Sequence, residues 1–318
     1  MAVCFGMHAP MAATSVKLAT TTWIGYGPFY VAEAMGFYAK YGVDAHLQTF
    51  SDPAMLPPAL ASAAVDGALM TYDQVIGAVA QGQQFKVVMP IDYSNGGDAI
   101  LAAAPFMKVM DLKGKKVAYA PLSPSDFLMA YALQVNGLTE KDIQPVNMAP
   151  EAVPAAMVSG AAPGGVTYEP SVSQILSTGG GKKFSVIYSS KDAPGLITDV
   201  LVFDGKRIPK QSTIIPGVIK GYIDGLAYMK AKPAEAAKII GKALGVTDKD
   251  VMEQLKGVYN IPPGEMGRNF VQSKETTSFF GSGAVVGNVL LKKGQIKAVP
   301  PIAATLDDSF VKALGSAK

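Results

Sequence analysis

The chain has 318 residues, of which 49% are apolar and 17% are charged, and its net charge is +3 at pH 7. This composition is typical of a globular protein with a substantial core, in one large domain or two ordinary ones, and it excludes a disordered chain. The small excess of lysine is spread along the chain, without a basic stripe interleaved with aromatic residues. A nucleic-acid partner is therefore not expected.

The N-terminal residues and the single cysteine bear on the compartment. Cys4 is the only cysteine, so no disulfide forms within the chain, which suits either the cytosol or a bacterial periplasm. Residues 1–13 are apolar and end in small residues, as the remnant of a secretory signal peptide does, although they have no positive n-region. A frayed chain start fits them equally well. No run of about 18 apolar residues occurs, so no membrane span is expected.

Short strands and helices alternate from residue 16 onward. Val16–Thr20 reads as a strand followed by a glycine-containing loop, and Pro28 suits the first turn of a helix that extends to about Tyr38. Further strands are predicted at 43–50, 67–70 and 85–91, and helices at 57–64 and 73–80. This alternation predicts the α/β class with a parallel sheet.

The remaining segments suggest two crossings between lobes. Residues 92–98 are polar and predicted to be flexible, and they form the first crossing. A second unit with the same order of elements extends from 115 to 188. A strand at 199–203 is the predicted return crossing. The helices predicted at 214–230, 233–244 and 249–258 would pack on the first lobe.

A repeated pattern supports two similar halves. Pro58-Ala59 precedes Thr71-Tyr72-Asp73, and Pro154-Ala155 precedes Thr167-Tyr168-Glu169 at the same offset. We therefore predict two α/β lobes with a ligand cleft between them. Lobe 1 would comprise residues 14–97 and 199–318, and lobe 2 residues 98–198.

Two carboxylates of this repeat are candidate ligand contacts. Ligands of parallel α/β sheets bind outside the carboxyl ends of the strands, and Asp73 and Glu169 directly follow predicted strands. Each also begins a predicted helix, where a carboxylate caps free N–H groups, so both interpretations stay open. Glu169 is favoured as the ligand contact and Asp73 as the cap.

Other loop residues fall at the same predicted edge. Trp23, the only tryptophan, is either a ligand platform or an anchor of the core beneath its loop. Ser51, Asp52, Ser123 and Ser125 either face the cleft or cap helices. The two histidines and one cysteine cannot build a metal cluster or a catalytic pair, and His46 is expected to be exposed. We expect no metal and no cofactor.

An ordered set of segments resembles the nitrate/sulfonate/taurine family of ABC-transporter substrate-binding proteins. The resemblance covers 16–314 and is carried by residues 17–37, 42–43, 92–100, 111–117, 167–170 and 192–202. It implies a type II periplasmic binding protein, with two α/β lobes joined by a two-strand hinge. Such a protein closes on a small ligand and docks to a membrane permease.

The family's ligand-contacting loops carry over to specific positions of this chain. These are Trp23, Gly25, Tyr26, Ser51, Asp52, Thr71, Tyr72, Asp73, Asp92, Tyr93, Ser94, Ser123, Ser125, Asp126, Tyr168, Glu169 and Asp199. Two departures fall in the same region. Ser171 stands where the family usually has an aromatic residue, and Asp126 where it often has histidine. The family's ligand therefore does not carry over with the fold.

The candidate residues favour a nitrogen-containing ligand. The predicted pocket is rich in carboxylates and has no arginine, so we expect a taurine- or alkylsulfonate-like zwitterion or an aminopyrimidine, ahead of nitrate or bicarbonate. The resemblance implies a periplasmic or other extracytoplasmic protein that acts as a monomer with an ABC permease, and not an enzyme. The alternative is a pyrimidine-precursor synthase-like enzyme on the same fold, whose chemistry in the family draws on histidine.

Overall fold

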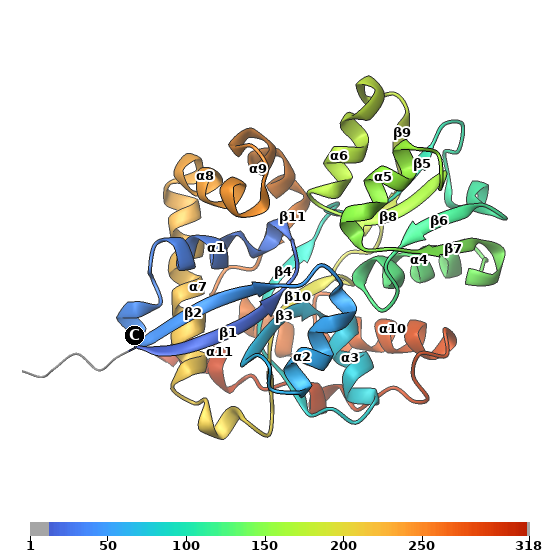
Figure 1. Ribbon diagram of the computed structural model, residues 1–318. Coiled ribbons are helices and arrows are strands. Elements are labelled where there is room, and N and C mark those ends of the chain that lie inside the picture. Colours follow the sequence, from blue (N-terminus) through green and yellow to red (C-terminus); the bar gives the residue numbers. More distant parts are fainter. Residues whose placement is uncertain (1–12, 317–318) are drawn as a thin grey trace, which may run out of the picture.

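Two β-sheets organise the chain in the computed structural model, which describes residues 13–316 (Figure 1). The larger sheet has the strand order β11-β4-β10-β3-β1-β2, and the smaller sheet has the order β7-β6-β8-β5-β9. The larger sheet comprises β1 (Thr14–Thr20), β2 (Val43–Thr49), β3 (Gly67–Thr71), β4 (Phe85–Ser94), β10 (Thr198–Asp204) and β11 (Val258–Asn260). The smaller comprises β5 (Asp98–Ala103), β6 (Lys116–Tyr119), β7 (Gln144–Asn147), β8 (Gly164–Tyr168) and β9 (Phe184–Ser189).

Helices cover both sheets, as the alternation predicts. They are α1 (Gly27–Ala34), α2 (Leu56–Ala61), α3 (Tyr72–Ala80), α4 (Pro124–Val135), α5 (Val153–Val158), α6 (Ser171–Ser177), α7 (Ile214–Ala231), α8 (Pro233–Leu244), α9 (Asp248–Gln254), α10 (Phe279–Lys292) and α11 (Ser309–Ser316). Among the residues described, no helix combines the length and apolar character needed to cross a bilayer. The signal remnant predicted at 1–13 lies almost wholly outside the described residues.

The sheets are mixed, so the prediction of purely parallel strands is wrong in part. In each sheet three neighbours are parallel, β2-β1-β3 and β7-β6-β8, whereas β10 and β5 run antiparallel to theirs. β11 also runs antiparallel to β4. The directions of β5 and β10 follow from the crossings. β4 leaves its sheet at the edge where β1 and β3 end, so β5 enters the other sheet from the facing edge and runs the opposite way. In the same way β9 ends at the edge of the smaller sheet that faces the larger one, so β10 enters the larger sheet from the facing edge and runs antiparallel to β3.

Two further elements differ from prediction. Residues 92–98 are mostly regular strand, because Asp92–Ser94 ends β4 and Asp98 begins β5. The predicted helix at 249–258 ends at Gln254, and residues 258–260 form β11, which pairs with β4. The carbonyl of Gly257 accepts hydrogen bonds from the N–H groups of Asn95 and Gly97, which fixes the short link between β4 and β5.

The core joins the two sheets. One cluster of buried side chains extends from Met70 and Ile76 through Phe279 to Phe127 and Val166. It is continuous because α10 packs against both α3 and α4 (Figure 1). The last third of the chain is mostly helical, as predicted, but through α10 it contacts helices of both sheets.

Candidate functional site

A small cavity lies where the carboxyl ends of strands from both sheets meet. It has a volume of about 20 Å³, enough for roughly one water molecule. Its wall comprises Thr21, Trp23, Tyr26, Pro53, Leu56, Met70, Thr71, Gln74, Asp98, Pro124, Tyr168 and Asp199. Because Asp98, Pro124 and Tyr168 come from the region of the smaller sheet and the others from that of the larger one, the cavity is enclosed by both.

Trp23 and Tyr168 meet across this cavity. Their rings pack edge to face with 5.9 Å between centroids, and the indole Nε1 donates a hydrogen bond of 3.3 Å to Asp92 Oδ1. The indole is 3% exposed, so Trp23 is both an anchor of the core and part of the cavity wall. A Cβ atom at Gly25 would lie 2.2 Å from the indole nitrogen, and only glycine permits this close approach.

Three buried carboxyl groups gather at the cavity. Asp92 and Asp199 face each other across β4 and β10, and Asp98 faces Tyr168 across β5 and β8. The Tyr26 hydroxyl donates to Asp199 Oδ1. Among the described residues, Asp92 Oδ2, Asp98 Oδ1 and the Tyr168 hydroxyl have no hydrogen-bond partner, although all are buried. Buried polar groups without partners are rare in proteins, and three of them at one cavity suggest a ligand site.

The carboxyl groups hold their protons more tightly than usual. Burial raises the pKa of Asp98 to about 8. Burial and then repulsion from Asp199 hold the pKa of Asp92 well above its usual range, and burial also raises the pKa of Asp199. None of the residues that line the cavity is Lys, Arg or His. Arg207 is held elsewhere, by the carbonyl groups of Leu60 and Val65.

The structure brings seven of the predicted site residues together. Trp23, Tyr26, Thr71, Tyr168 and Asp199 line the cavity, while Gly25 and Asp92 contact its wall. The sequence prediction missed Asp98, Thr21 and Gln74. Asp98 marked the end of the predicted crossing, and its place at the start of a strand after that crossing was a signal that it faces the cleft.

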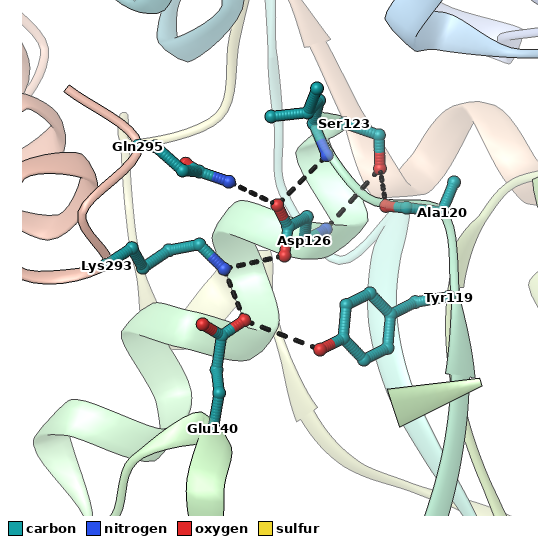
Figure 2. Close-up of polar contacts among 8 residues, drawn as sticks. Tyr119, Ala120, Ser123, Asp126, Glu140, Lys293 and Gln295 are labelled. Carbon is teal, nitrogen blue, oxygen red and sulfur yellow. Dashed lines mark hydrogen bonds and ion pairs between the residues drawn. The ribbon is translucent and has the colours of Figure 1, made fainter. Parts of the chain in front are cut away.

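Asp126 was predicted to contact the ligand, but it does not line the cavity. Figure 2 shows the polar contacts that its side chain makes instead. Its carboxylate accepts hydrogen bonds from Lys293 Nζ at 2.8 Å, Gln295 Nε2 at 2.7 Å and the Leu122 N–H at 3.0 Å. Lys293 also pairs with Glu140. Ser123 is an N-cap of α4, because its hydroxyl accepts from the Asp126 N–H at 3.4 Å. These residues hold the start of α4 in place.

Glu169, the favoured ligand contact, is also placed as a cap. Its carboxylate accepts from the Ser173 hydroxyl at 2.8 Å and the Ser173 N–H at 3.0 Å, at the start of α6. It does not line the cavity. Asp73 lies in the first turn of α3 and faces a second cavity, on the other side of Gln74. The preference for Glu169 over Asp73 as a ligand contact therefore finds no support in the geometry.

The other predicted site residues do not line the cavity. The Tyr72 hydroxyl bonds to Thr305 at 2.8 Å, and the Tyr93 ring stacks on Tyr259. Ser94 bonds to Ser190 at 2.9 Å and so ties the two crossings together. The remaining three are Ser51, which is exposed, Asp52, which caps the Ala54 N–H, and Ser125, which is buried outside the wall.

The described residues include no group of three or more His, Cys, Asp and Glu side chains arranged to hold a metal ion. His46 is exposed on β2, as predicted, between Glu33 and Asp44. His8 lies outside the described residues. The cavity therefore offers carboxyl groups, hydroxyl groups and an aromatic wall, a donor and acceptor set suited to binding a polar ligand that contains nitrogen.

Comparison with known proteins assigns the chain to a family. The Escherichia coli K12 taurine-binding periplasmic protein is 24% identical over 280 residues, which cover 86% of this chain and 85% of that protein. A Haemophilus influenzae protein named for thiamine biosynthesis is 31% identical over 119 residues, which cover 37% of this chain and 38% of that protein. The chain thus spans only about two fifths of this second relative's length.

Solved structures confirm the predicted fold. The alkanesulfonate-binding protein SsuA from Xanthomonas axonopodis pv. citri, bound to MOPS, has a TM-score of 0.77 at 15% identity and covers 94% of this chain and 99% of that chain. Residues 23–236 match the sequence model of the family described as NMT1/THI5 like, which is more than half of the chain. The chain therefore belongs to the NMT1/THI5-like family.

Proposed function

We propose that the chain is the extracytoplasmic solute-binding protein of an ABC importer, which captures a small nitrogen-containing organic solute and delivers it to a permease. The observation that carries this proposal is the cluster of Asp92, Asp98 and Asp199 at an enclosed cavity between two sheets. The periplasmic taurine-binding relative supports the transport role.

The cluster favours an amine or a protonated ring nitrogen, because a positive group would let the carboxyl groups release their protons and ionise. A unit negative charge placed 4 Å from a carboxylate is disfavoured by about 4 kcal/mol at an effective dielectric constant near 20, and a positive charge is favoured by as much. A bare anion such as nitrate would meet several carboxyl groups and no basic side chain in the wall. A taurine-like zwitterion would direct its amine to Asp98 and Asp199, and an aminopyrimidine would direct its ring nitrogens there.

Capture requires the lobes to move. The volume of about 20 Å³ holds roughly one water molecule, so an organic solute enters only when the two sheets separate. The motion we propose is a hinge at the links 95–97 and 190–197, between lobe 1 (14–97 and 199–318) and lobe 2 (98–198). The protein would act as a monomer.

The geometry of the described residues does not favour the enzymatic alternative. A pyrimidine-precursor synthase-like chemistry would need histidine at the site, and His46 lies on the outer face of β2, away from the cavity. We propose that the chain binds its solute without transforming it.

The test is a native mass spectrum of the purified protein, followed by titration calorimetry with taurine, butanesulfonate, 4-aminopyrimidine, nitrate and bicarbonate. We expect a nitrogen-containing organic compound to bind, and Asp98→Asn to weaken it by roughly tenfold or more. Asp44→Asn removes an exposed carboxylate on β2 and is the matched control. Binding of nitrate or bicarbonate alone would overturn the assignment of the ligand class.

A further inference from the structure

A second, larger cavity adjoins the first and belongs to no site described so far. It has a volume of about 310 Å³ and lies between α2, α3, the end of α10 and the loop before α4. Gln74 lines both cavities and separates them. Its Nε2 donates to the carbonyl groups of Pro53 at 2.8 Å and Leu122 at 3.2 Å.

The wall of this cavity is fixed by the ion-pair cluster at Asp126 (Figure 2). Leu122 and Gln295 both line the cavity, and both donate hydrogen bonds to the Asp126 carboxylate. Lys293, whose side chain is only 7% exposed, neutralises this carboxylate at 2.8 Å. The cavity is thus bounded by hydrogen-bonded groups from distant parts of the chain, and its shape depends on contact between α10 and the start of α4.

One carboxyl oxygen at this cavity lacks a partner. Asp73 is 5% exposed and lines the cavity, and its Oδ1 has no hydrogen-bond partner in the part of the chain that the structure describes. Burial raises the pKa of Asp73 to about 6, so the group is still mostly ionised at neutral pH. A buried polar atom without a partner is destabilising, and a ligand that donates a hydrogen bond to it would recover this loss.

The rest of the lining defines the shape and polarity of a ligand. Pro57, Ala78 and Leu290 supply apolar surface, and the amide side chains of Gln81 and Gln295 supply hydrogen-bonding groups. None of the lining residues is Lys, Arg or His. The volume is within the range of small-molecule sites, about 300–1,000 Å³.

We propose that this second cavity binds a small organic cation, with an ammonium or amidinium group paired to Asp73 and a compact apolar body against Pro57, Ala78 and Leu290. Leu122 belongs to the loop before α4, whereas the other walls belong mostly to helices of the larger sheet. A cation bound between them therefore favours the closed arrangement, in which the two sheets lie close together. By linkage, the cation then strengthens solute binding in the first cavity by the same factor by which the solute strengthens binding of the cation.

The probe is cyclohexylamine, with cyclohexanol as its uncharged counterpart of the same shape, in calorimetric titrations of the full chain. We expect cyclohexylamine to bind and cyclohexanol to bind at least tenfold more weakly. Asp73→Asn should weaken cyclohexylamine binding by roughly tenfold or more. Ala61→Trp, at the exposed rim of the cavity, should block it without altering the core.

Two controls separate this site from the first cavity. Asp44→Asn removes a distant exposed carboxylate and should leave cyclohexylamine binding unchanged, and Asp98→Asn distinguishes binding in the first cavity from binding in the second. Unchanged binding in Asp73→Asn or in Ala61→Trp would overturn the proposal, as would equal binding of cyclohexanol. Loss of binding in Asp98→Asn alone would place the amine in the first cavity and would equally overturn it.

Discussion

Asp98 is a buried carboxyl group in the wall of the first cavity. One of its oxygens has no partner among the described residues, and burial raises its pKa to about 8. A carboxyl group in this setting is costly to ionise unless a positive group approaches. An amine bound next to Trp23 and Tyr168 would supply the missing partner of this carboxyl group.

The pH dependence of stability follows from this shift. The folded state holds the Asp98 proton up to about pH 8, whereas the unfolded chain releases it near the ordinary pKa of 3.8. The contribution of Asp98 to stability is therefore fully present at low pH and is lost as the pH rises through this window. We expect the thermal midpoint to fall from pH 4 to pH 8, and to fall less in Asp98→Asn. Parallel curves for the two proteins would contradict the assignment.

A variant of Glu169 distinguishes a helix cap from a ligand contact. The position of this residue after a strand suggested the cavity, but its carboxylate is occupied by Ser173. We expect Glu169→Ala to cost about 0.5–2 kcal/mol of unfolding free energy, because α6 loses its cap, and to leave ligand affinity within twofold. Chemical denaturation and titration of the same variant check both parts. A large loss of affinity at full stability would restore Glu169 to the site.

At the scale of elements, α10 links the two halves of the molecule. It packs against α3 and α4, and the residue directly after it, Lys293, pairs with Asp126 and Glu140. Removing one partner of a buried ion pair leaves an uncompensated charge, so such pairs tie elements together more firmly than exposed ones. The cluster therefore favours the arrangement in which α10 and α4 are in contact.

The variant Lys293→Met should break this contact. We expect a loss of about 3–5 kcal/mol in unfolding free energy, because Asp126 is left buried without its cation. We also expect a larger radius of gyration by small-angle X-ray scattering. Lys256→Met, which removes an exposed pair with Glu253, is the matched control and should cost at most about 1 kcal/mol. Equal stabilities of the two variants would argue against a role for the cluster in closure.

Local patterns predicted most elements, because hydrophobic alternation and helix stop signals are local. The α/β class, most helices and the place of Trp23 in a loop at the cavity follow from them, whereas Tyr26 and Asp199 were predicted from the family resemblance. The direction of β5 and β10 and the strand β11 did not, because they depend on pairing with distant strands. The roles of Asp126 and Glu169 were missed for a related reason. A carboxylate at a strand end serves as a cap or as a ligand contact according to its partners, and Lys293 is far away in sequence.

For the whole molecule, enclosure is the property that connects fold and function. The carboxyl ends of strands from both sheets meet at one cavity. Two crossings join the sheets, and a hydrogen bond between Ser94 and Ser190 ties the crossings together. Trp23 touches Tyr168 across the cavity, so separation of the sheets changes the surroundings of the only tryptophan. Intrinsic fluorescence therefore reports closure directly.

The most direct test of the central claim compares ligands that differ only in the amine. Trp23 fluorescence is titrated with taurine against isethionate, which has a hydroxyl group in place of the amine, and with 4-aminopyrimidine against 4-pyrimidinone. In the pair that binds more tightly, we expect the compound with the amine to bind at least tenfold more tightly than its amine-free counterpart. Asp98→Asn should remove most of this difference in affinity. Equal binding of the amine-free partner, or tight binding of nitrate, would contradict it.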